Sequence, residues 1–481
     1  MTAEKALALD AIESQKNEFF DLSDKIWEFA ELSLKEFKSA DLYCEVLEKL
    51  GFTVERNVAH MQTCFKGTFG SGKPVIGILG EFDALSGLSQ VGGATEHIEA
   101  QKGGSGHGCG HNMLGAGALA AAYGIKEYLK KTGKTGTVVF FGTPGEEGGA
   151  GKAFMAKENL FYPVDACLTW HPDDVNEVAT GTCNSCIQTL YKFSGVAAHA
   201  AGDPEDGRSA LDAVELMNVG VQYLREHVKP DARIHYAMID GGGFSPNVVQ
   251  PTASVLYMVR SILVKDANAL QARVDKIAEG AALMTGTTYE KIFIDGCSNT
   301  VPNHVIEKKL YENFAELGVD KYTDKEWAYA KALKATYPLR DSLPSIAAKC
   351  GAEKKKSVAE ETANGSRALN DVLAPLYDGD CFEPGSTDVG DVSWQTPAVQ
   401  LHTVCFTSGA PGHSWQNVSC GKTSIGHKGL LSAAKVLAMT AVDLFEDANL
   451  LKAARDEFAE RAKDGYTCPI PENEFAKAVE L

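Results

Sequence analysis

Hydrophobic residues recur at two different periods in the first part of the chain, and the two periods separate helices from strands. Residues 11–50 carry apolar side chains at helical spacing, and Gly51 ends the second helical stretch. Unbroken apolar runs predict strands buried on both faces of a sheet, at residues 75–79, 137–141 and 166–170. Residues 114–131, rich in Gly and Ala, predict a helix that packs closely on this sheet. Strands that alternate with helices in this way predict a parallel sheet.

The pattern changes near residue 187 and changes back near residue 300. Between these points the order is βαββαβ, the ferredoxin-like arrangement, with strands at 187–194, 234–239, 254–262 and 287–294 and helices at 209–226 and 266–284. Gly241–Gly243 marks the turn between the middle strands. We therefore predict an α/β protein in which a mostly parallel-sheet domain, residues 1–186 and 300–481, carries an inserted ferredoxin-like domain, residues 187–299.

The chain beyond residue 299 is polar and helix-rich. Residues 352–365 predict an exposed loop or a frayed helix, because Glu, Lys, Ser and Thr dominate them. Residues 397–406 predict a further strand and residues 426–444 an amphipathic helix. The tail, residues 459–481, is polar and weakly patterned.

Composition narrows the class of protein. The chain has 481 residues, 44% hydrophobic and 23% charged, as expected of a two-domain globular protein. Its net charge of -18 argues against a nucleic-acid partner, because phosphate binding needs clustered Lys and Arg. No apolar run reaches the roughly 20 residues of a membrane span, and the N-terminus does not resemble a signal peptide. The 12 scattered cysteines favour reduced thiols and a cytoplasmic location.

Three separated segments carry side chains of the types that bind metals. They are His107-Gly-Cys-Gly-His-Asn112, Glu146-Glu147 and Trp170-His171-Pro172. Each follows an apolar, strand-like run, which is the layout of a site at the carboxyl ends of parallel strands. A spare carboxylate beside such ligands favours metal-assisted hydrolysis.

The first segment places Cys109 and His111 two residues apart. In an extended segment this spacing points both side chains to one side, and both thiolate and neutral imidazole bind metals. Two other interpretations stay open at this point. One is a buried Cys beside a His that caps a loop. The other is a Cys–His nucleophile pair, which needs a base and an orienting group within hydrogen-bond reach.

The second segment, Glu146-Glu147, follows a strand and a turn and precedes the Gly-rich residues 148–151. Adjacent carboxylates usually lie on a solvated surface, but this position between an apolar strand and a Gly-rich run does not require solvation. One acid can bind a metal while its neighbour accepts a proton from water.

His171 and His413 each follow a strand, and this shared placement favours both as ligands over two structural histidines. Glu81 and Asp83 come directly after the strand at 75–79. Both could bind a metal, but we expect them to orient a ligating histidine from behind.

Three residues of the inserted domain are candidates for substrate binding: His199, Asn247 and Arg260. Small residues around His199 leave room for a ligand, and an Arg can hold a carboxylate through two hydrogen bonds. A capping His and a surface Arg are the structural alternatives. Cys183-x-x-Cys186 is a single C-x-x-C, which is weak evidence for a zinc knuckle or a redox site.

Taken together, these motifs resemble the M20 family of metallo-aminoacylases and carboxypeptidases over nearly the whole chain. The motifs that carry the resemblance are Gly80-Glu-Phe-Asp-Ala-Leu85, His107-Gly-Cys-Gly-His-Asn112, Gly145-Glu-Glu-Gly-Gly149, Thr169-Trp-His-Pro172, Ser245-Pro-Asn-Val-Val-Gln250, Ser386-Thr-Asp-Val-Gly-Asp-Val-Ser-Trp394 and Thr423-Ser-Ile-Gly-His-Lys428. Many relatives have a His-x-Asp motif where this chain has Glu81-Phe82-Asp83, and a bridging Asp where it has Cys109. The chain therefore resembles a branch with a Cys-x-His motif.

The resemblance implies a site for two divalent metal ions, manganese or zinc, with the ligands Cys109, His111, Glu147, His171 and His413. Asp83 would orient a ligand, and Glu146 would be the general base that passes a proton from water to the leaving amine. The inserted domain would form a dimer and close over the substrate. His199 would stabilise the oxyanion, and His199 and Asn247 would reach the substrate in their own site or in the site of the partner subunit. Arg260 would hold the α-carboxylate of the substrate.

The activity that the resemblance implies is hydrolysis of the amide bond of an N-acyl amino acid, such as p-aminobenzoyl-glutamate. A dipeptidase or general aminoacylase of the same family is the alternative among enzymes. Another alternative is a subunit that needs a related chain for activity. The expected partners are thus a small-molecule substrate and either a second copy of the chain or a related subunit.

Overall fold

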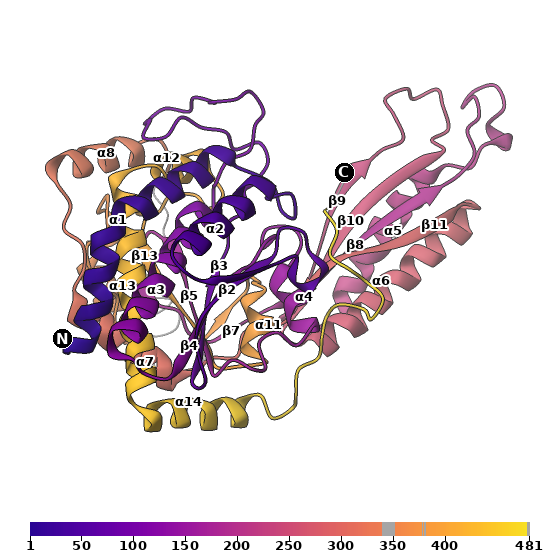
Figure 1. Cartoon of the computed structure of the whole chain (residues 1–481). Coiled ribbons are helices and arrows are strands. Elements are labelled where there is room, and N and C mark those ends of the chain that lie inside the picture. Colours follow the sequence, from indigo (N-terminus) through magenta and orange to yellow (C-terminus); the bar gives the residue numbers. More distant parts are fainter. Residues whose placement is uncertain (339–351, 378, 380, 479–481) are drawn as a thin grey trace. The chain divides into compact units, whose positions relative to one another are not determined.

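The computed structural model describes residues 1–338, 352–377, 379 and 381–478. The chain divides into two compact units (Figure 1). Unit 1 consists of Met1–Thr182, Val301–Phe382 and Val392–Tyr466, and unit 2 of Cys183–Thr300, Glu383–Asp391 and the chain from Thr467 onward.

These units differ from the predicted domains at two segments that belong to unit 2 rather than to the larger domain. The first is Glu383–Asp391, where the Asp391 carboxylate accepts hydrogen bonds from the N–H and Oγ of Ser298 at 2.9 and 2.8 Å. The second is the tail from Thr467, where Pro469 lies beside Gly296. Both contacts join residues that are distant in the sequence, so the local pattern of hydrophobic residues does not predict them.

Unit 1 is built on a seven-stranded sheet in the order β1-β2-β4-β3-β5-β13-β6. The four middle strands, β4, β3, β5 and β13, run parallel, and β1, β2 and β6 are antiparallel to their neighbours. The strands are β1 (Thr53–Arg56), β2 (Phe65–Ser71), β3 (Val75–Gly80), β4 (Gly136–Gly142), β5 (Ala166–Asp173), β6 (Glu177–Val178) and β13 (Ala398–Val404). The unbroken apolar runs of the sequence are therefore central strands, as predicted, because helices cover both of their faces.

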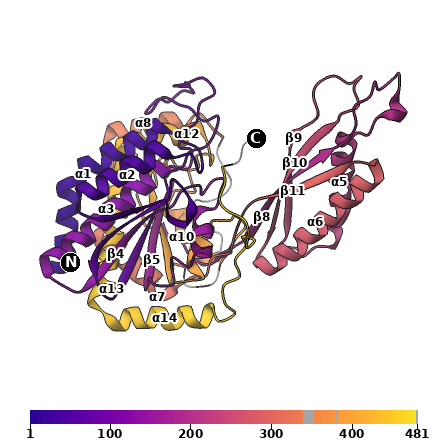
Figure 2. The ribbon, with the colours of Figure 1, turned by 45° about the vertical axis from the view of Figure 1, so that its right-hand side comes forward.

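The longer helices of unit 1 lie around this sheet, some in direct contact with its strands and others packed on those helices (Figures 1 and 2). They are α1 (Ala3–Phe29), α2 (Phe37–Lys49), α3 (His111–Thr132), α7 (His304–Leu317), α8 (Asp324–Lys334), α13 (Ser424–Glu446) and α14 (Ala448–Arg461). Helix α3 packs against both α1 and α13 and contacts β2, β3, β4 and β5. In the described part of the chain, no helix combines the length and apolarity needed to cross a bilayer.

The small residues of α3 allow the close packing that the sequence predicts. Trp170 of β5 lies against this helix, and its Nε1 donates a hydrogen bond to the carbonyl of Leu114 at 2.9 Å. A Cβ atom on Gly117 would lie 2.8 Å from the Trp170 ring. Any side chain at Gly117 would therefore push α3 away from the strand that carries His171.

Shorter elements complete the chain. They are η1 (Val58–His60), α4 (Gly151–Lys157), β7 (Thr182–Cys183), η2 (Pro204–Asp206), η3 (Arg225–His227), α10 (Ala352–Glu361), β12 (Phe382–Glu383), α11 (Val389–Ser393) and α12 (Trp415–Cys420). Residues 352–365, for which the sequence predicted a loop or a frayed helix, contain the helix α10. Ten described cysteines are free thiols and Cys381 is disulfide-bonded, so the fold is not held by a disulfide framework.

Unit 2 has the predicted βαββαβ order. Its antiparallel sheet has the strand order β11-β8-β10-β9, which is the ferredoxin-like topology. The elements are β8 (Ser185–Ser194), α5 (Ala210–Leu224), β9 (Arg233–Asp240), β10 (Thr252–Ser261), α6 (Val264–Thr285) and β11 (Thr288–Cys297). Helices α5 and α6 pack against each other and on β8 and β10, and together they form the core of this unit.

Candidate metal centre

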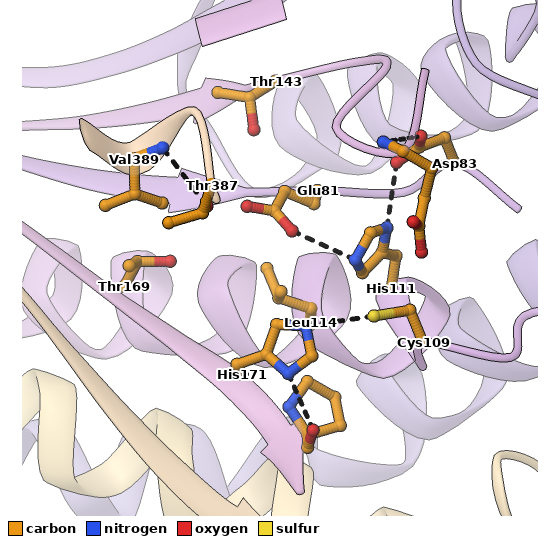
Figure 3. Close-up of polar contacts among 12 residues, drawn as sticks. Glu81, Asp83, Cys109, His111, Leu114, Thr143, Thr169, His171, Thr387 and Val389 are labelled. Carbon is orange, nitrogen blue, oxygen red and sulfur yellow. Dashed lines mark hydrogen bonds and ion pairs between the residues drawn. The ribbon is translucent and has the colours of Figure 1, made fainter. Parts of the chain in front are cut away.

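The metal-binding side chains predicted from the sequence lie together in unit 1, at the carboxyl ends of the parallel strands. Asp83 follows β3, Glu147 follows β4, and His171 lies near the end of β5. Cys109 and His111 stand at the N-terminus of α3 (Figure 3). Two overlapping groups bring their ligand atoms within 4.8 Å of one another: Cys109, His111 and His171, and Cys109, Glu147 and His413.

Cys109 and His171 face each other across the first group. The Cys109 Sγ lies 3.2 Å from the Nε2 of His171 (Figure 3). The other ring nitrogen, Nδ1, lies 2.7 Å from the carbonyl oxygen of Pro172, so a proton on Nδ1 leaves the Nε2 lone pair directed at Cys109. Gly110 makes the turn between Cys109 and α3 with a φ of +84°, and a Cβ there would lie 2.9 Å from Met113 and Phe406.

His111 is held from two sides by carboxylates (Figure 3). Its Nδ1 lies 2.9 Å from Asp83 Oδ1, and its Nε2 lies 3.2 Å from Glu81 Oε2. The second oxygen of Asp83 accepts hydrogen bonds from Ser33 Oγ at 2.8 Å and from the Glu147 N–H at 2.9 Å. Asp83 therefore has the geometry of a carboxylate that orients a histidine from behind.

Glu81 is placed differently from Asp83, although the sequence suggested one role for both. It faces Nε2, the nitrogen that a metal would use, and it forms a third candidate ligand group with His111 and Glu146. Its other oxygen forms a buried ion pair with Lys152 at 2.8 Å. Sequence reasoning missed Lys152, because a single Lys in a Gly-rich segment is typical of a surface loop.

His413 completes the second group from the loop that follows β13. Its Nε2 lies 3.4 Å from Glu147 Oε1, and its backbone has a φ of +51°. The His413 side chain is 55% exposed, whereas Glu147 is largely buried. The site therefore has one edge that solvent and a small substrate can reach.

Burial shapes the protonation of the cluster. It lowers the pKa of His171 to about 4, so this ring is neutral and able to bind a metal. Burial raises the pKa of the Cys109 thiol and of the Glu147 carboxyl. Burial would also raise the pKa of Asp83, but hydrogen bonds from His111, Glu147 and Ser33 lower it to about 2.

The donor atoms fit divalent metal ions. Glu81 Oε2, His111 Nε2 and Glu147 Oε1 are buried, and within the described chain they have no hydrogen-bond partner besides the ion-pair contacts given above. A buried polar atom left unpaired costs about 1–3 kcal/mol, which a metal ion would offset. Thiolate, imidazole and carboxylate are the ligand types of zinc, and imidazole and carboxylate also suit manganese.

A further charged cluster lies beside His171 and was not found from the sequence. In the parallel register of β5 and β13, His402 stands opposite His171, and their ring centroids are 6.1 Å apart. Its Nδ1 lies 3.0 Å from Asp173 and 3.5 Å from Glu177. Burial opposes protonation of His402, but its bonds to Asp173 and Glu177 raise the pKa to about 10. Asp173, Glu177 and His402 also bring their ligand atoms within 4.8 Å of one another, so they form a fourth candidate metal-binding group beside the main cluster.

The three substrate-binding candidates belong to unit 2 and are not part of the cluster in unit 1. The Nδ1 of His199 accepts backbone hydrogen bonds from Ala201 and Gly202 at 3.2 and 2.9 Å. Its proton is therefore on Nε2, and the ring is a hydrogen-bond donor. The Asn247 side chain is exposed, and the Nη1 of Arg260 donates a hydrogen bond to Ser386 at 2.5 Å.

The two cysteines of the C-x-x-C motif, Cys183 and Cys186, do not face each other in the structure. Cys186 on β8 stands opposite Cys297 on β11, with 3.2 Å between the two sulfur atoms. Cys183 belongs to none of the metal-binding groups of the described residues.

Known proteins resemble this chain over most of its length. The family model for peptidase family M20/M25/M40 matches residues 77–441. One subunit of the p-aminobenzoyl-glutamate hydrolase of Escherichia coli (strain K12) is 46% identical over 468 residues, which are 96% of this chain and 97% of that protein. The human Xaa-Arg dipeptidase is 27% identical over 410 residues, 84% of this chain and 76% of that protein. A Bacillus subtilis structure, described as a dinuclear metal-binding peptidase of family M20, shares the fold with a TM-score of 0.53 at 17% identity, over 90% of this chain and 99% of that one.

Proposed function

The chain belongs to peptidase family M20/M25/M40, and on that premise we propose that it hydrolyses p-aminobenzoyl-glutamate to p-aminobenzoate and glutamate. The observation that carries this proposal is the cluster of Cys109, His111, Glu147, His171 and His413 in unit 1. The likeness of the chain to one subunit of a p-aminobenzoyl-glutamate hydrolase supports the choice of substrate.

We propose the five residues of that cluster as ligands of two divalent metal ions. Bound there, the ions would polarise the amide carbonyl and acidify water. The thiolate of Cys109 favours zinc, and the carboxylate and imidazole ligands also accept manganese. Asp83 acts through His111, because its hydrogen bond to Nδ1 directs Nε2 into the site.

We assign the proton transfer to Glu146. It lies in one group with Glu81 and His111, so it borders the proposed metal ions. Its carboxylate takes a proton from the attacking water and gives it to the leaving amine of glutamate. The amide bond breaks between the acyl carbon and this nitrogen.

We assign recognition of the substrate to unit 2. His199 presents an Nε2–H, since its Nδ1 already accepts two backbone N–H groups, and this donor suits the oxyanion that forms from the amide carbonyl. Arg260 would bind the α-carboxylate. Asn247 precedes β10 and Arg260 lies at the far end of this strand, so we propose that His199 and Asn247 reach the substrate in the site of the partner subunit.

We propose that unit 2 pairs with a second copy of the chain. Strand β9 is an edge of its sheet and exposes Tyr236 and Met238, which are 45% and 44% accessible. The exposed face of α5 adds Leu216, Val219 and Tyr223. An apolar helix face next to an open strand edge favours a symmetric dimer in which two sheets join. A mixed assembly with a related chain is the alternative, since the Escherichia coli relative is itself named as one subunit of an enzyme.

The first experiment measures release of p-aminobenzoate from p-aminobenzoyl-glutamate by the purified chain, with manganese or zinc added. Metal-dependent release that a chelator abolishes supports both the reaction and the sufficiency of this chain. If activity appears only after a related chain is added, the mixed assembly is supported. If the chain cleaves dipeptides instead, it is a dipeptidase like the human relative.

The same assay tests the Cys–His nucleophile. A thiol hydrolase would resist the chelator and lose activity on alkylation of Cys109. The proposed metal enzyme shows the opposite response to the chelator. We expect the reaction to take place in the cytoplasm, where the free thiols of ten cysteines persist.

A further inference from the structure

The buried carboxylate of Glu36 lies beside the loop that carries Glu146, although the two residues are distant in the sequence. Glu36 directly precedes α2, and its side chain is fully buried. Its Oε1 accepts a hydrogen bond from the N–H of Gly145 at 2.9 Å, across 109 positions of the sequence. The N–H of Leu34 donates to the same oxygen at 2.8 Å. Glu36 therefore joins the turn before α2 to the residue that precedes Glu146.

The N–H of Gly145 is buried and needs an acceptor. Gly145 follows β4 with a φ of +71°, so it makes the turn that leads the chain from this strand into Glu146 and Glu147. A buried N–H without a hydrogen-bond partner is costly, and such groups are rarely left unpaired. The carboxylate of Glu36 therefore fixes the direction in which this turn leaves the sheet.

Leu34 holds the same loop by packing. A Cβ on Gly145 would lie 3.0 Å from the Leu34 side chain, and a Cβ on Gly149 would lie 2.8 Å from it. Leu34 thus lies against glycines on both sides of the paired acids. Its backbone has a φ of +61°, which is uncommon for a residue other than glycine and persists only where surrounding contacts enforce it.

Residues 31–36 also contact the second loop of the metal centre, the one that follows β3. The Oγ of Ser33 donates to Asp83 at 2.8 Å, and the carbonyl of Glu31 accepts the N–H of Ala84 at 2.8 Å. Asp83 in turn accepts the N–H of Glu147 at 2.9 Å. One short segment thus fixes the loop after β3 and the loop after β4 against each other.

We propose that Glu36 is a positioning residue for the reaction, which holds Glu146 in place through the N–H of Gly145. This inference rests on the proposed function, in which Glu146 carries the proton from water to the leaving amine. Asp83 fixes the far side of the base, at the N–H of Glu147, and Glu36 fixes the near side. A displacement of about 1 Å can cost a reacting group about 10²-fold in rate, so this anchoring affects turnover.

Two variants of the metal-loaded full chain test this role by steady-state kinetics on p-aminobenzoyl-glutamate. Glu36→Ala leaves the N–H of Gly145 without this acceptor, and we expect kcat to fall about 10²-fold while KM stays nearly unchanged. Glu36→Gln keeps an oxygen that accepts both N–H groups and should retain most of the wild-type kcat. Burial and the charge of Asp83 raise the pKa of Glu36 above its usual range, which makes the neutral amide a close substitute.

Asp165→Ala is the matched control. Asp165 is another buried carboxylate, and its Oδ2 accepts the N–H of Val75 at 2.7 Å, across 90 positions of the sequence. It directly precedes β5, so it lies at the amino ends of the parallel strands, away from the metal centre. We expect both alanine variants to lower the unfolding temperature, but Asp165→Ala should keep the wild-type kcat. An equal fall in kcat in both variants would overturn the inference, because general destabilisation would then explain it.

Hydrogen exchange measured by mass spectrometry gives a readout that does not depend on turnover. Peptides that cover residues 143–149 should exchange faster in Glu36→Ala and at the wild-type rate in Glu36→Gln. Faster exchange with an unchanged kcat would overturn the inference, because the loop could then move without affecting the reaction. Loss of one metal ion from Glu36→Ala would also overturn it, because Glu36 would then act through Glu147.

The outcomes distinguish this inference from the function on which it rests. If the wild-type chain cleaves a dipeptide but not p-aminobenzoyl-glutamate, the proposed substrate is wrong, and the same comparison of kcat on the dipeptide decides the inference. A wild-type chain without any hydrolytic activity overturns both.

Discussion

At the scale of single residues, Glu146 is the side chain whose loss should separate metal binding from turnover. Glu146→Ala removes the group that carries the proton but none of the five proposed ligands. We expect kcat to fall about 10³-fold, the size typical of a lost general base, while two metal ions per chain remain. Metal analysis of the purified variant together with its kcat checks this. Near-normal turnover would show that another group is the base.

His413 offers the complementary test, since its loss should affect one metal site and leave the other. It contacts only the group formed with Cys109 and Glu147, and its side chain is the most exposed of the proposed ligands. His413→Ala should therefore weaken one of two binding events in a zinc titration. His227→Ala, a change at an exposed histidine of unit 2, is the control. An unaltered stoichiometry and affinity in His413→Ala would remove His413 from the ligand set.

At the scale of elements, the packing of α3 on β5 sets the distance between the side chains of Cys109 and His171. Gly117→Ala would place a Cβ 2.8 Å from the Trp170 ring, and overpacking of this kind costs about 1–3 kcal/mol. Gly280→Ala in α6 is the matched change, because its Cβ position has nothing within 4 Å. We expect urea unfolding to show Gly117→Ala destabilised and Gly280→Ala stabilised by about 0.5–1 kcal/mol. Equal changes in the free energy of unfolding for the two variants would mean that α3 can move away from β5 at no cost.

The elements also show what the sequence could and could not predict. Periods of hydrophobic residues predicted the central strands and the βαββαβ unit, because both depend on contacts that are local or follow chain order. The cluster of His402, Asp173 and Glu177 depends on β13 inserting between β5 and β6. Strand order of that kind is a long-range property, so no spacing of residues revealed it.

The same limit applies to the proposed metal centre. Glu147 was found because it follows a strand, where ligands of parallel sheets collect. Cys109 and His111 were found from their spacing and residue types, but they stand at the N-terminus of α3 and do not directly follow a strand as the sequence predicted. Lys152 was not found, because burial turns an ordinary lysine into the partner of Glu81. The burial of Lys152 and its pairing with Glu81 depend on tertiary contacts, and a local sequence pattern does not show such contacts.

At the scale of the whole molecule, the predicted dimer should depend on the exposed face of unit 2. Met238→Lys puts a charge on the open edge of β9, and charged edge strands resist pairing. We expect sedimentation to show a monomer, whereas Phe37→Lys, a comparable change on the 48% exposed Phe37 of unit 1, should leave the dimer intact. A dimer that survives Met238→Lys would place the interface elsewhere.

The division of candidate residues between the two units has an evolutionary consequence. Every proposed metal ligand comes from unit 1, and His199, Asn247 and Arg260 all come from unit 2. The reactive centre and the reader of the substrate are thus encoded in separate stretches of the gene. Mutation within residues 183–300 can therefore change the groups that contact the substrate while leaving every proposed metal ligand in place. Because Glu383–Asp391 and the chain from Thr467 onward also belong to unit 2, any new sequence between residues 183 and 300 has to remain compatible with these two distant segments.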